Sequence, residues 1–495
     1  MMRVLLLLLP VVVLAQTPRF ANPQRRALLA TAYPELDRVF ERYFKEKAVP
    51  GMVYGVVVDG ELVRVKGFGV RDIGSNDPVT ANTVFRIASM TKSYTALAIL
   101  KLRDEGKLSL DDLVSKWVPE IASLKYPTRD SAPLRVRQLL THGAGFPEDN
   151  PWGDRQLAIS DAELGKWLDS GIPFSTTPDT TFEYSNYGFA LAGRIVAKVS
   201  GKPYAEYLEK EILRPLGLKS TWLDPNEVPV GRRAIGYGRR NDKLFEIESL
   251  RHGSFGPMGG ILTDAGDMAK YVAFHLSAEP GRDDAEAGPV RRASVREMQR
   301  AWRAGRGAGY GYGLSVSSNC RFEHIVGHGG GLPGFGSYMM WLPDYGVGIF
   351  AMTNFTYSGP TSAIREAFEV LAKTGGLEPR ALPVSPTLAA MQGSLVKLWQ
   401  SWSDRTVDEL AADNLFLDKP RAIYQAEVAQ LNSRFKNCKS GEMKPENWLR
   451  GGFEFSCDEG SVGVSFTLAP TNPPKLQMLR FTANPPKPVA PKCDP

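Results

Sequence analysis

The sequence lacks the short signatures that would assign a cofactor or an α/β-hydrolase triad. It contains no G-x-S-x-G, which excludes that arrangement of the nucleophile, and no Gly-rich loop that ends in G-K-[ST], so nothing predicts a phosphate-binding loop. Its four cysteines form no C-x-x-C pair and its five histidines form no close cluster, which argues against a structural zinc site. We therefore expect neither a metal nor an organic cofactor.

An excess of charge of one sign is missing as well. Sixty basic and 54 acidic residues give a net charge of +6 over 495 residues, and no block of five like charges occurs. A balance this even is not the signature of a nucleic-acid-binding chain, so we expect no nucleic-acid partner. The composition, 43% apolar and 23% charged, is that of a globular protein, and the length favours two or more structural units.

Long apolar runs are missing except at the start of the chain. Residues 1–3 form a short basic segment, residues 4–14 are apolar, and Ala15 completes a small-residue cleavage pattern. Together these features predict a signal peptide over residues 1–15. The apolar run is too short to cross about 30 Å of hydrocarbon. We therefore expect a secreted or periplasmic protein with no transmembrane segment after signal removal.

Export permits disulfide bonds among the few cysteines. Cys438 and Cys457 are nearest in sequence and flank two predicted strands, which favours a bond between them over four free thiols. The pairing of Cys320 and Cys493 stays open, because four cysteines allow three connectivities.

The first large domain, residues 16–375, has strand-like text at both ends and mixed, mostly helical text between them. This order predicts an α/β (α+β) fold in which one antiparallel sheet is covered by the terminal helices and carries a large, mostly helical insertion. The segments expected as helices are 35–47, 91–102 and 362–372, and those expected as strands are 52–58, 61–65, 325–326, 337–342 and 347–353.

A proline-rich linker at residues 376–386 precedes a second, small α+β domain at residues 387–495. Helical patterns are followed there by alternating, strand-like text, an order that weakly resembles NTF2-like domains. We expect a stabilising or binding module, and its ligand is not predicted. The helices are expected at 387–402 and 420–435, and the strands at 453–457, 462–468 and 476–482.

Catalytic chemistry is indicated first by an S-x-x-K motif at Ser89 and Lys92. A serine hydroxyl needs a nearby base to become a nucleophile, and a spacing of three on a helix places an amine beside it. Ser394 and Ser433 start equally good S-x-x-K matches, but both lie in what reads as ordinary surface helix. Ser89 differs because it follows strand-like text and begins an apolar helix, whose N-terminus favours developing negative charge.

Two further motifs supply what an acyl-transfer site needs. Tyr184 and Asn186 form a Y-x-N, in which a phenol can relay a proton and an amide can hold both the lysine and a substrate carbonyl. His328 is followed by three glycines, and glycines let a substrate approach a strand edge whose N–H can serve an oxyanion. A Gly-rich turn is the alternative interpretation of this last motif.

Together and in this order, the motifs resemble the serine β-lactamase, DD-peptidase and esterase superfamily, and especially the class C β-lactamase branch, which uses Y-x-N. The resemblance extends over residues 30–375. It includes the flanking text at residues 139–143, 259–263 and 310–313. It implies that Ser89 is acylated with Lys92 and Tyr184 moving the proton. It further implies that Asn186, His328, Gly330 and Gly331 form the substrate and oxyanion side, with N–H groups of Ser89 and Gly331 holding the oxyanion.

The third motif departs from the K-T-G of many members. A literal K-T-G at residues 373–375 ends a predicted helix and is a decoy, so the third motif is the one at His328. A neutral histidine and the absence of a hydroxyl at Gly329 both weaken recognition of a substrate carboxylate. Arg251 or the stretch 303–306 is a candidate to replace the missing charge. If the pKa of His328 lies near 6.5, the histidine becomes charged at acid pH, and the preference for neutral substrates over those with a carboxylate should then become smaller.

We therefore expect an exported serine hydrolase that cleaves esters, amides or D-amino-acid peptides through an acyl-enzyme. A β-lactamase or D-Ala-D-Ala carboxypeptidase is the alternative, and a catalytically silent binding or sensor protein of the same fold is the hypothesis from another class. His142 belongs to the family-like flanking text and is expected to be structural. The sequence predicts a small-molecule partner but no oligomeric state.

Overall fold

The structure, a computed structural model, describes residues 17–150, 152–305 and 307–485. These fall into two compact units, one of residues 22–379 and one of residues 380–485 together with 17–21. The predicted signal peptide and Cys493 lie outside the described residues. Within the described ranges, no helix is both long enough and apolar enough to cross a membrane.

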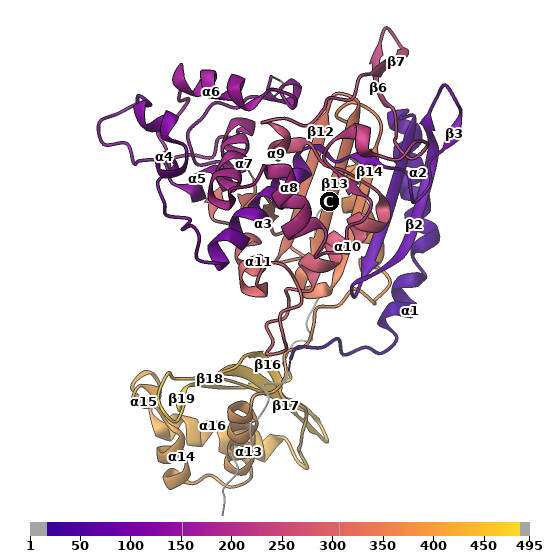
Figure 1. Ribbon diagram of the computed structural model, residues 1–495. Helices are drawn as coiled ribbons and strands as arrows, with labels where there is room; N and C mark the ends of the chain where they lie inside the picture. Colours follow the sequence, from indigo (N-terminus) through magenta and orange to yellow (C-terminus); the bar gives the residue numbers. More distant parts are fainter. Residues whose placement is uncertain (1–16, 151, 306, 486–495) are drawn as a thin grey trace, which may run out of the picture. The chain divides into compact units, whose positions relative to one another are not determined.

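The larger unit is built on a nine-stranded antiparallel sheet with the order β3-β2-β1-β14-β13-β12-β11-β10-β9 (Figure 1). Strand β1 (Gly51–Val58) pairs with its hairpin partner β2 (Glu61–Asp72) and, on the other side, with β14 (Val347–Thr353) from the far end of the unit. The other strands are β3 (Asp77–Pro78), β9 (Arg303–Ala304), β10 (Gly309–Tyr310), β11 (Ser315–Ser317), β12 (Ile325–Leu332) and β13 (Phe335–Leu342).

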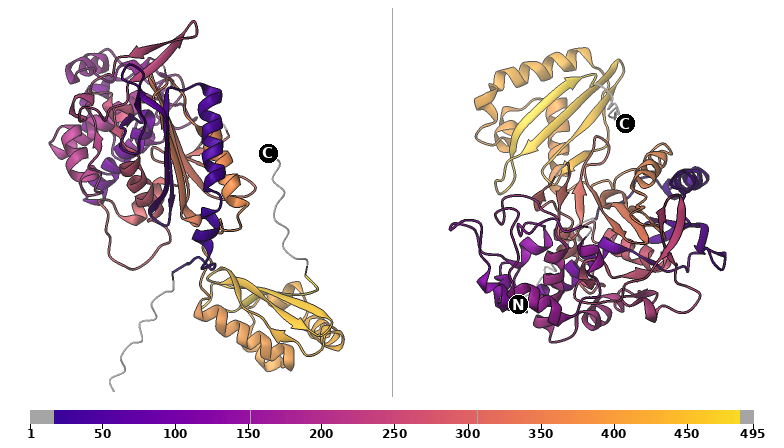
Figure 2. Two further views of the ribbon diagram at one scale, coloured as in Figure 1. Left: turned by 90° about the vertical axis from the view of Figure 1, so that its right-hand side faces the viewer. Right: turned by 90° about the horizontal axis from the view of Figure 1, so that it is seen from above.

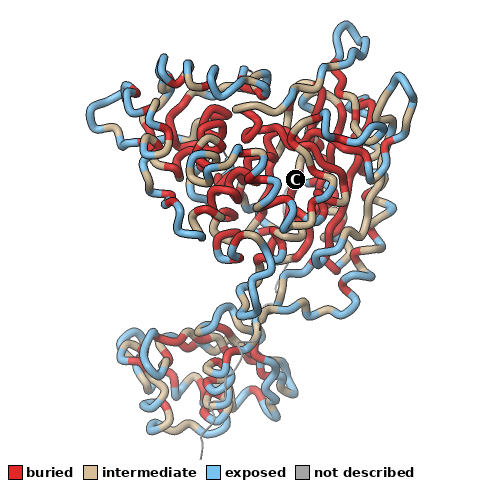
Figure 3. Tube along the Cα trace, viewed as in Figure 1, coloured by how far each residue is buried: buried red, intermediate tan, exposed pale blue. Residues whose placement is uncertain are grey.

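Helices cover both faces of this sheet. The terminal helices α2 (Tyr33–Lys47) and α12 (Thr361–Ala372) pack together on one face, where their apolar side chains form one core cluster with the strands (Figure 2). The inserted helices, including α3 (Thr91–Asp104), α7 (Asn186–Ser200) and α10 (Ala265–Leu276), form a larger core with the other face (Figure 3). Every residue of β1 is buried as a result. The predicted antiparallel sheet with terminal covering helices and a helical insertion is confirmed.

The insertion also contains shorter elements that position the loops around the sheet. A small sheet joins β4 (Phe85–Arg86), β8 (Leu262–Thr263) and β5 (Thr221–Trp222), and a separate hairpin joins β6 (Gly236–Arg240) to β7 (Lys243–Ile247). The remaining helices of this unit are α1 (Arg25–Ala30), α4 (Val114–Trp117), α5 (Val136–Leu140), α6 (Asp161–Asp169), α8 (Tyr204–Leu208), α9 (Gly256–Gly259) and α11 (Arg292–Met298).

The smaller unit has helices first and strands second, in the predicted order. An antiparallel sheet with the order β15-β17-β18-β19, to which β16 adds beside β17, packs its apolar face on the helices. The likeness to NTF2-like domains stays a prediction. The helices are α13 (Pro386–Gln400), α14 (Asp404–Leu410), α15 (Leu415–Asp418) and α16 (Arg421–Arg434), and the strands are β15 (Lys439–Ser440), β16 (Lys444–Asn447), β17 (Arg450–Cys457), β18 (Gly460–Leu468) and β19 (Leu476–Ala483).

A disulfide bond joins Cys438 to Cys457 in this unit, as the sequence predicts. It ties the residue before β15 to the last residue of β17, two strands that pair with each other.

Replacing both of these cysteines with serine should destabilise the smaller unit. The bond closes a loop with a sequence separation of 19, and in the chain-entropy model such a loop contributes roughly 3 kcal/mol to the free energy of unfolding. Calorimetry of the Cys438→Ser/Cys457→Ser chain should show lower-temperature melting of this unit. Fluorophosphonate labelling of Ser89 should be unaffected, because the three motifs lie in the larger unit. Unchanged melting would contradict the prediction.

Candidate active site

Ser89 lies in a tight turn between strand β4 and helix α3. The preceding residue, Ala88, is fully buried and has φ +49°, a left-handed conformation that non-glycine residues rarely adopt. Residues 88–90 form a 3₁₀ turn that leads directly into α3 at Thr91. Such a conformation persists only where the surrounding structure holds it in place, and it is typical of functional sites.

Strand β12, which carries the third motif, and its neighbour β13 hold this turn in place. The Ser337 hydroxyl donates to the carbonyl of Ile87 at 2.8 Å. At Gly330, a Cβ atom would lie 2.2 Å from that same carbonyl oxygen and 2.2 Å from the Ser337 hydroxyl. The role of Gly330 that the geometry supports is therefore close approach of β12 to the Ser89 turn, since its own position does not line the cavity around Ser89.

Lys92 is the most tightly enclosed group of the site. Its side chain is fully buried one turn of helix after Ser89, and its Nζ lies 3.1 Å from the Ser89 Oγ, 2.7 Å from the Asn186 Oδ1 and 3.0 Å from the Met258 carbonyl oxygen. The amide oxygen and the carbonyl can only accept hydrogen bonds. A neutral amine has two N–H bonds and one lone pair, so these two acceptors leave its lone pair for the Ser89 hydroxyl.

Burial also favours the neutral amine. It lowers the pKa of Lys92 to about 7, although the nearby carboxylates of Asp154 and Asp149 oppose this shift. A lysine with this pKa can accept a proton at neutral pH, which an exposed lysine cannot do.

Asn186 lies behind the lysine rather than in the cavity. Its side chain is fully buried, and its Nδ2 donates to the Asn150 Oδ1 at 2.5 Å and to the Asp154 Oδ1 at 3.4 Å. Asp149 holds the start of α7 by accepting from the backbone N–H groups of Asn186 at 2.7 Å and Tyr187 at 2.8 Å. The amide oxygen thus orients Lys92, and because Asn186 is not among the residues that line the cavity, its contact with a substrate carbonyl stays a prediction.

Tyr184 lies beside this serine and lysine. The centroid of its ring lies 4.8 Å from the Lys92 Nζ, and its hydroxyl interacts with the Ser89 side chain. Burial raises the pKa of Tyr184 well above its usual value, and the hydrogen bond to Ser89 offsets only part of this. The phenol is therefore protonated at neutral pH and can act as a donor.

His328 corrects one of our expectations. Burial, together with the charge of Lys92, lowers its pKa to about 4, so the value near 6.5 is wrong. Its Nδ1 faces the Gly329 carbonyl at 2.6 Å and must carry the proton, which leaves its Nε2 to accept from the Tyr310 hydroxyl at 2.8 Å. Both ring nitrogens are engaged, so His328 presents neither a charge nor a free donor to a substrate carboxylate.

His142 is placed as a structural residue. It is buried, its Nδ1 accepts from the backbone N–H of Ser185 at 3.1 Å, and its ring packs 4.2 Å from that of Tyr184 and 4.7 Å from that of Tyr310. Burial lowers the pKa of His142 well below its usual value. It supports the tyrosine of the second motif.

Ser89 opens into a cavity of about 490 Å³. Neither Arg251 nor Arg303 lines it, and each is paired elsewhere, with Asp224 and Asp179. The proposed replacement of the missing positive charge by either side chain is therefore wrong, and residue 306 lies outside the described residues. The lining residues are Ser89, Asn150, Asp154, Phe182, Tyr184, Tyr310, Ser315, His328, Gly329, Gly331 and Tyr357.

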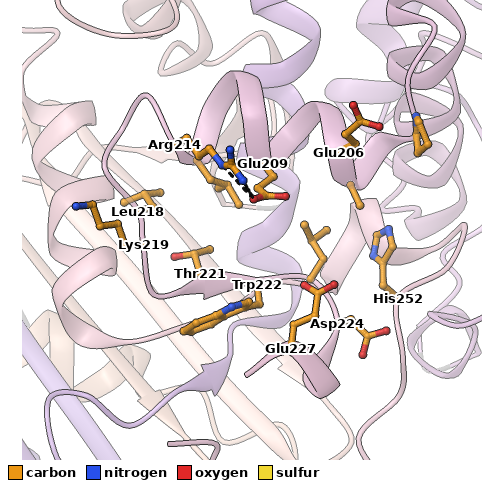
Figure 4. Close-up of a pocket in the computed structure, with 14 residues that line it drawn as sticks. Glu206, Glu209, Arg214, Leu218, Lys219, Thr221, Trp222, Asp224, Glu227 and His252 are labelled. Atoms are coloured by element: carbon orange, nitrogen blue, oxygen red, sulfur yellow. Dashed lines mark hydrogen bonds and ion pairs between the residues drawn. The ribbon is translucent and has the colours of Figure 1, made fainter. Parts of the chain in front are cut away.

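Cavity volume alone would favour a different candidate site. A cavity of about 1010 Å³ beside α8 and β5 contains four carboxylates, of which Glu209 is paired with Arg214 (Figure 4) and Asp224 with Arg251. None of the three motifs contributes a side chain to it. His252 lines this cavity and has a pKa lowered by burial to about 4, but no nucleophile lies beside it in a serine–lysine arrangement.

The competing motifs have local roles. The hydroxyls of Ser394 and Ser433 donate to carbonyls of their own helices, α13 and α16. In the K-T-G segment, Lys373 follows the end of α12 and Gly375 has φ +72° in the turn after it, as expected of a helix end.

Four polar residues of the site were not predicted. Asp149, Asn150 and Asp154 come from the segment between α5 and α6, and Tyr357 follows β14 with φ +53°. The only sequence signal for the first three is a cluster of acidic and amide residues, which loops commonly contain.

The family model described as beta-lactamase matches residues 36–373. The chain belongs to the beta-lactamase family. The match covers the sheet, the inserted helices and all three motifs, and it therefore assigns the larger unit to a family of serine hydrolases with this fold.

Individual relatives are distant. Beta-lactamase-like protein 2 of Dictyostelium discoideum is 32% identical over 53% of this chain and 50% of its own length. Protein flp of Staphylococcus aureus (strain MW2) is 27% identical over 65% of this chain and 64% of its own length. The D-alanyl-D-alanine-carboxypeptidase/endopeptidase AmpH of Escherichia coli (strain K12) is 26% identical over 71% of this chain and 91% of its own length. The chain thus spans only about half to two thirds of the first two relatives.

Solved structures show the same fold. An octameric penicillin-binding protein homologue from Pyrococcus abyssi has a TM-score of 0.60 and 24% identity, and covers 90% of this chain and 95% of its own. A class C beta lactamase from Rhodobacter sphaeroides has a TM-score of 0.56 and 25% identity, and covers 68% of this chain and 98% of its own.

The lowered lysine pKa predicts the pH dependence of serine acylation. If neutral Lys92 is the base, the second-order rate of fluorophosphonate labelling should rise about tenfold per pH unit below pH 7 and level off above pH 8, because the neutral fraction is then complete. His328, with a pKa near 4, should add no step near pH 6.5. A rate that continues to rise through pH 10 would indicate an unperturbed lysine and contradict the assignment.

Proposed function

We propose that residues 22–379 form an exported serine hydrolase that cleaves esters or amides through an acyl-enzyme on Ser89. The observation that carries this proposal is the contact between a fully buried lysine amine and the Ser89 hydroxyl at 3.1 Å, with the amine's two other acceptors unable to donate. This is the arrangement of an activated nucleophile and its base.

In the first half-reaction, the Ser89 oxygen bonds to the substrate carbonyl carbon while its proton passes to Lys92. The backbone N–H groups of Ser89 and Gly331, both of which line the cavity, would stabilise the negative oxygen of the tetrahedral intermediate. Tyr184 then donates its proton to the leaving oxygen or nitrogen as that bond breaks, and the proton on Lys92 restores the phenol.

In the second half-reaction, water takes the place of the leaving group. It attacks the acyl carbon and gives up a proton to the same Tyr184–Lys92 pair, and the Ser89 oxygen leaves with a proton returned by that pair. Besides the substrate and this water molecule, no further group is needed to balance the two steps. Asn186 holds the amine in place throughout by accepting one of its N–H bonds.

The cavity favours substrates without a carboxylate beside the scissile bond. No lysine or arginine is among the described residues that line it, and His328 is neutral with both nitrogens engaged. We therefore favour esters, amides and D-amino-acid peptides with an uncharged leaving side. The name of the AmpH relative supports the alternative, a carboxypeptidase acting on D-alanyl-D-alanine ends.

Export is part of the proposal. The N-terminal sequence pattern supports it, as does the disulfide bond between Cys438 and Cys457, since such bonds persist in oxidising compartments. The smaller unit is proposed to be an accessory module.

Replacing Ser89 with alanine tests the nucleophile. Ser89→Ala should lower turnover at least about a thousandfold and abolish fluorophosphonate labelling, while the circular dichroism spectrum stays unchanged. Ser394→Ala is the matched control, because its hydroxyl bonds only to its own helix, and it should keep activity within about twofold. If Ser394→Ala silenced the enzyme and Ser89→Ala did not, the assignment would be wrong.

The missing cation predicts a preference between substrates. Neutral short-chain esters should have a higher kcat/KM than penicillins, because a hydrogen bond to a charged group contributes roughly 1.5–3 kcal/mol, or about tenfold to a hundredfold. An acylated D-Ala-D-Ala peptide and its C-terminal amide make a matched pair, and the amide should be cleaved at least as fast. Faster hydrolysis of penicillin than of any neutral ester at pH 7 would contradict this preference.

A further inference from the structure

The cavity at Ser89 contains one formally charged side chain among its described lining residues, apart from the neutral His328, and that side chain is acidic. Asp154 lies in a short 3₁₀ turn and is 98% buried, with 2% of its surface exposed. A buried carboxylate that faces a binding cavity is costly unless a partner compensates its charge.

The contacts of Asp154 leave acceptor capacity unused. Its Oδ2 accepts from the Tyr357 hydroxyl at 2.9 Å, and its Oδ1 accepts the long 3.4 Å bond from Asn186. A carboxylate offers about four lone-pair positions. Asp154 also lines a neighbouring cavity together with Arg155 and Arg86. Burial raises the pKa of its carboxyl, and the Tyr357 hydrogen bond and the positive charges of Lys92 and Arg155 oppose this shift.

Aromatic rings also line this cavity, and one of them, Tyr357, contacts the carboxylate through its hydroxyl. Phe182, Tyr184, Tyr310 and Tyr357 all line the same cavity. The faces of aromatic rings attract ammonium groups, and carboxylates bind them directly. A cavity whose described lining contains one carboxylate, several rings and no cationic side chain is suited to a positively charged ligand.

The site also indicates which part of a substrate carries the charge. His328 and Gly331 lie three residues apart on β12, and so roughly 10 Å apart along the strand. The rings of Tyr184 and Tyr310 lie near His328, whereas Tyr357 lies against Gly331 and carries Asp154 with it. The proton donor for the leaving group is Tyr184, so the leaving group occupies the His328 end and the acyl group occupies the Asp154 end.

We infer that Asp154 selects substrates whose acyl part bears an ammonium group, such as aminoacyl or aminoalkanoyl esters and amides. The inference rests on the proposed function, because it assigns an acyl side to a cavity in which Ser89 is the nucleophile. It adds a specificity-determining residue and a preferred substrate charge to a site whose other described lining residues are uncharged.

Two matched pairs of substrates test this. The p-nitrophenyl esters of 4-(trimethylammonio)butyrate and 5,5-dimethylhexanoate have the same shape and differ in one charge. The p-nitroanilides of alanine and isobutyrate differ by an ammonium against a methyl group. In at least one pair, kcat/KM should be about tenfold or more higher for the cationic member. This comparison uses the unmodified chain, so it does not depend on the folding of any variant.

The variant Asp154→Asn assigns the preference to this carboxylate. It should reduce the ratio of cationic to neutral kcat/KM to near one, whatever it does to the rate on the neutral substrate. Asp344→Asn, in an exposed turn after β13, removes the same charge elsewhere and should keep the ratio within about twofold.

The possible outcomes distinguish failure of this inference from failure of the proposed function. Three results would overturn the inference without contradicting the proposed hydrolase: turnover with no preference for the cationic member of either pair, a preference for an anionic glutarate ester, or an unchanged ratio of cationic to neutral kcat/KM in Asp154→Asn. Absence of both turnover and Ser89 labelling would overturn the proposed function itself.

Discussion

The site depends on one buried amine. Lys92 has no exposed surface, and its Nζ is surrounded by the Ser89 hydroxyl, an amide oxygen and a backbone carbonyl. Burying a charged ammonium is unfavourable, so the surroundings favour the neutral amine, the form that the proposed serine nucleophile requires of its base. The same burial keeps the neighbouring phenol of Tyr184 protonated. One desolvated environment therefore provides both a base and an acid at neutral pH.

The fold holds this amine from several distant parts of the chain. Asp149 fixes the start of α7, which places the amide of Asn186 against the lysine. The left-handed Ala88 turns the chain so that the serine begins α3. Strand β12 approaches that turn at Gly330, where no side chain would fit. The junction between the sheet and the inserted helices therefore depends on a strained backbone at Ala88 and on a glycine at residue 330.

The sequence predicts best what is set by local spacing. The S-x-x-K and Y-x-N motifs identify residues that the structure brings together, and strongly periodic segments such as α2 and β14 are found within two residues of their predicted limits. Burial is a property of the assembled fold, so the pKa of His328 and the inward position of Asn186 could not be deduced from spacing. Asp154 escaped prediction for the same reason, because its loop reaches the cavity only through tertiary packing.

The most direct test of the account is to locate the covalent adduct. The purified chain would be treated with a fluorophosphonate, digested and mapped by tandem mass spectrometry. The account predicts one phosphonyl group per chain, on Ser89, in the peptide that also contains Lys92. An adduct on any other residue, or none on folded protein, would contradict the claim that the buried lysine activates this serine.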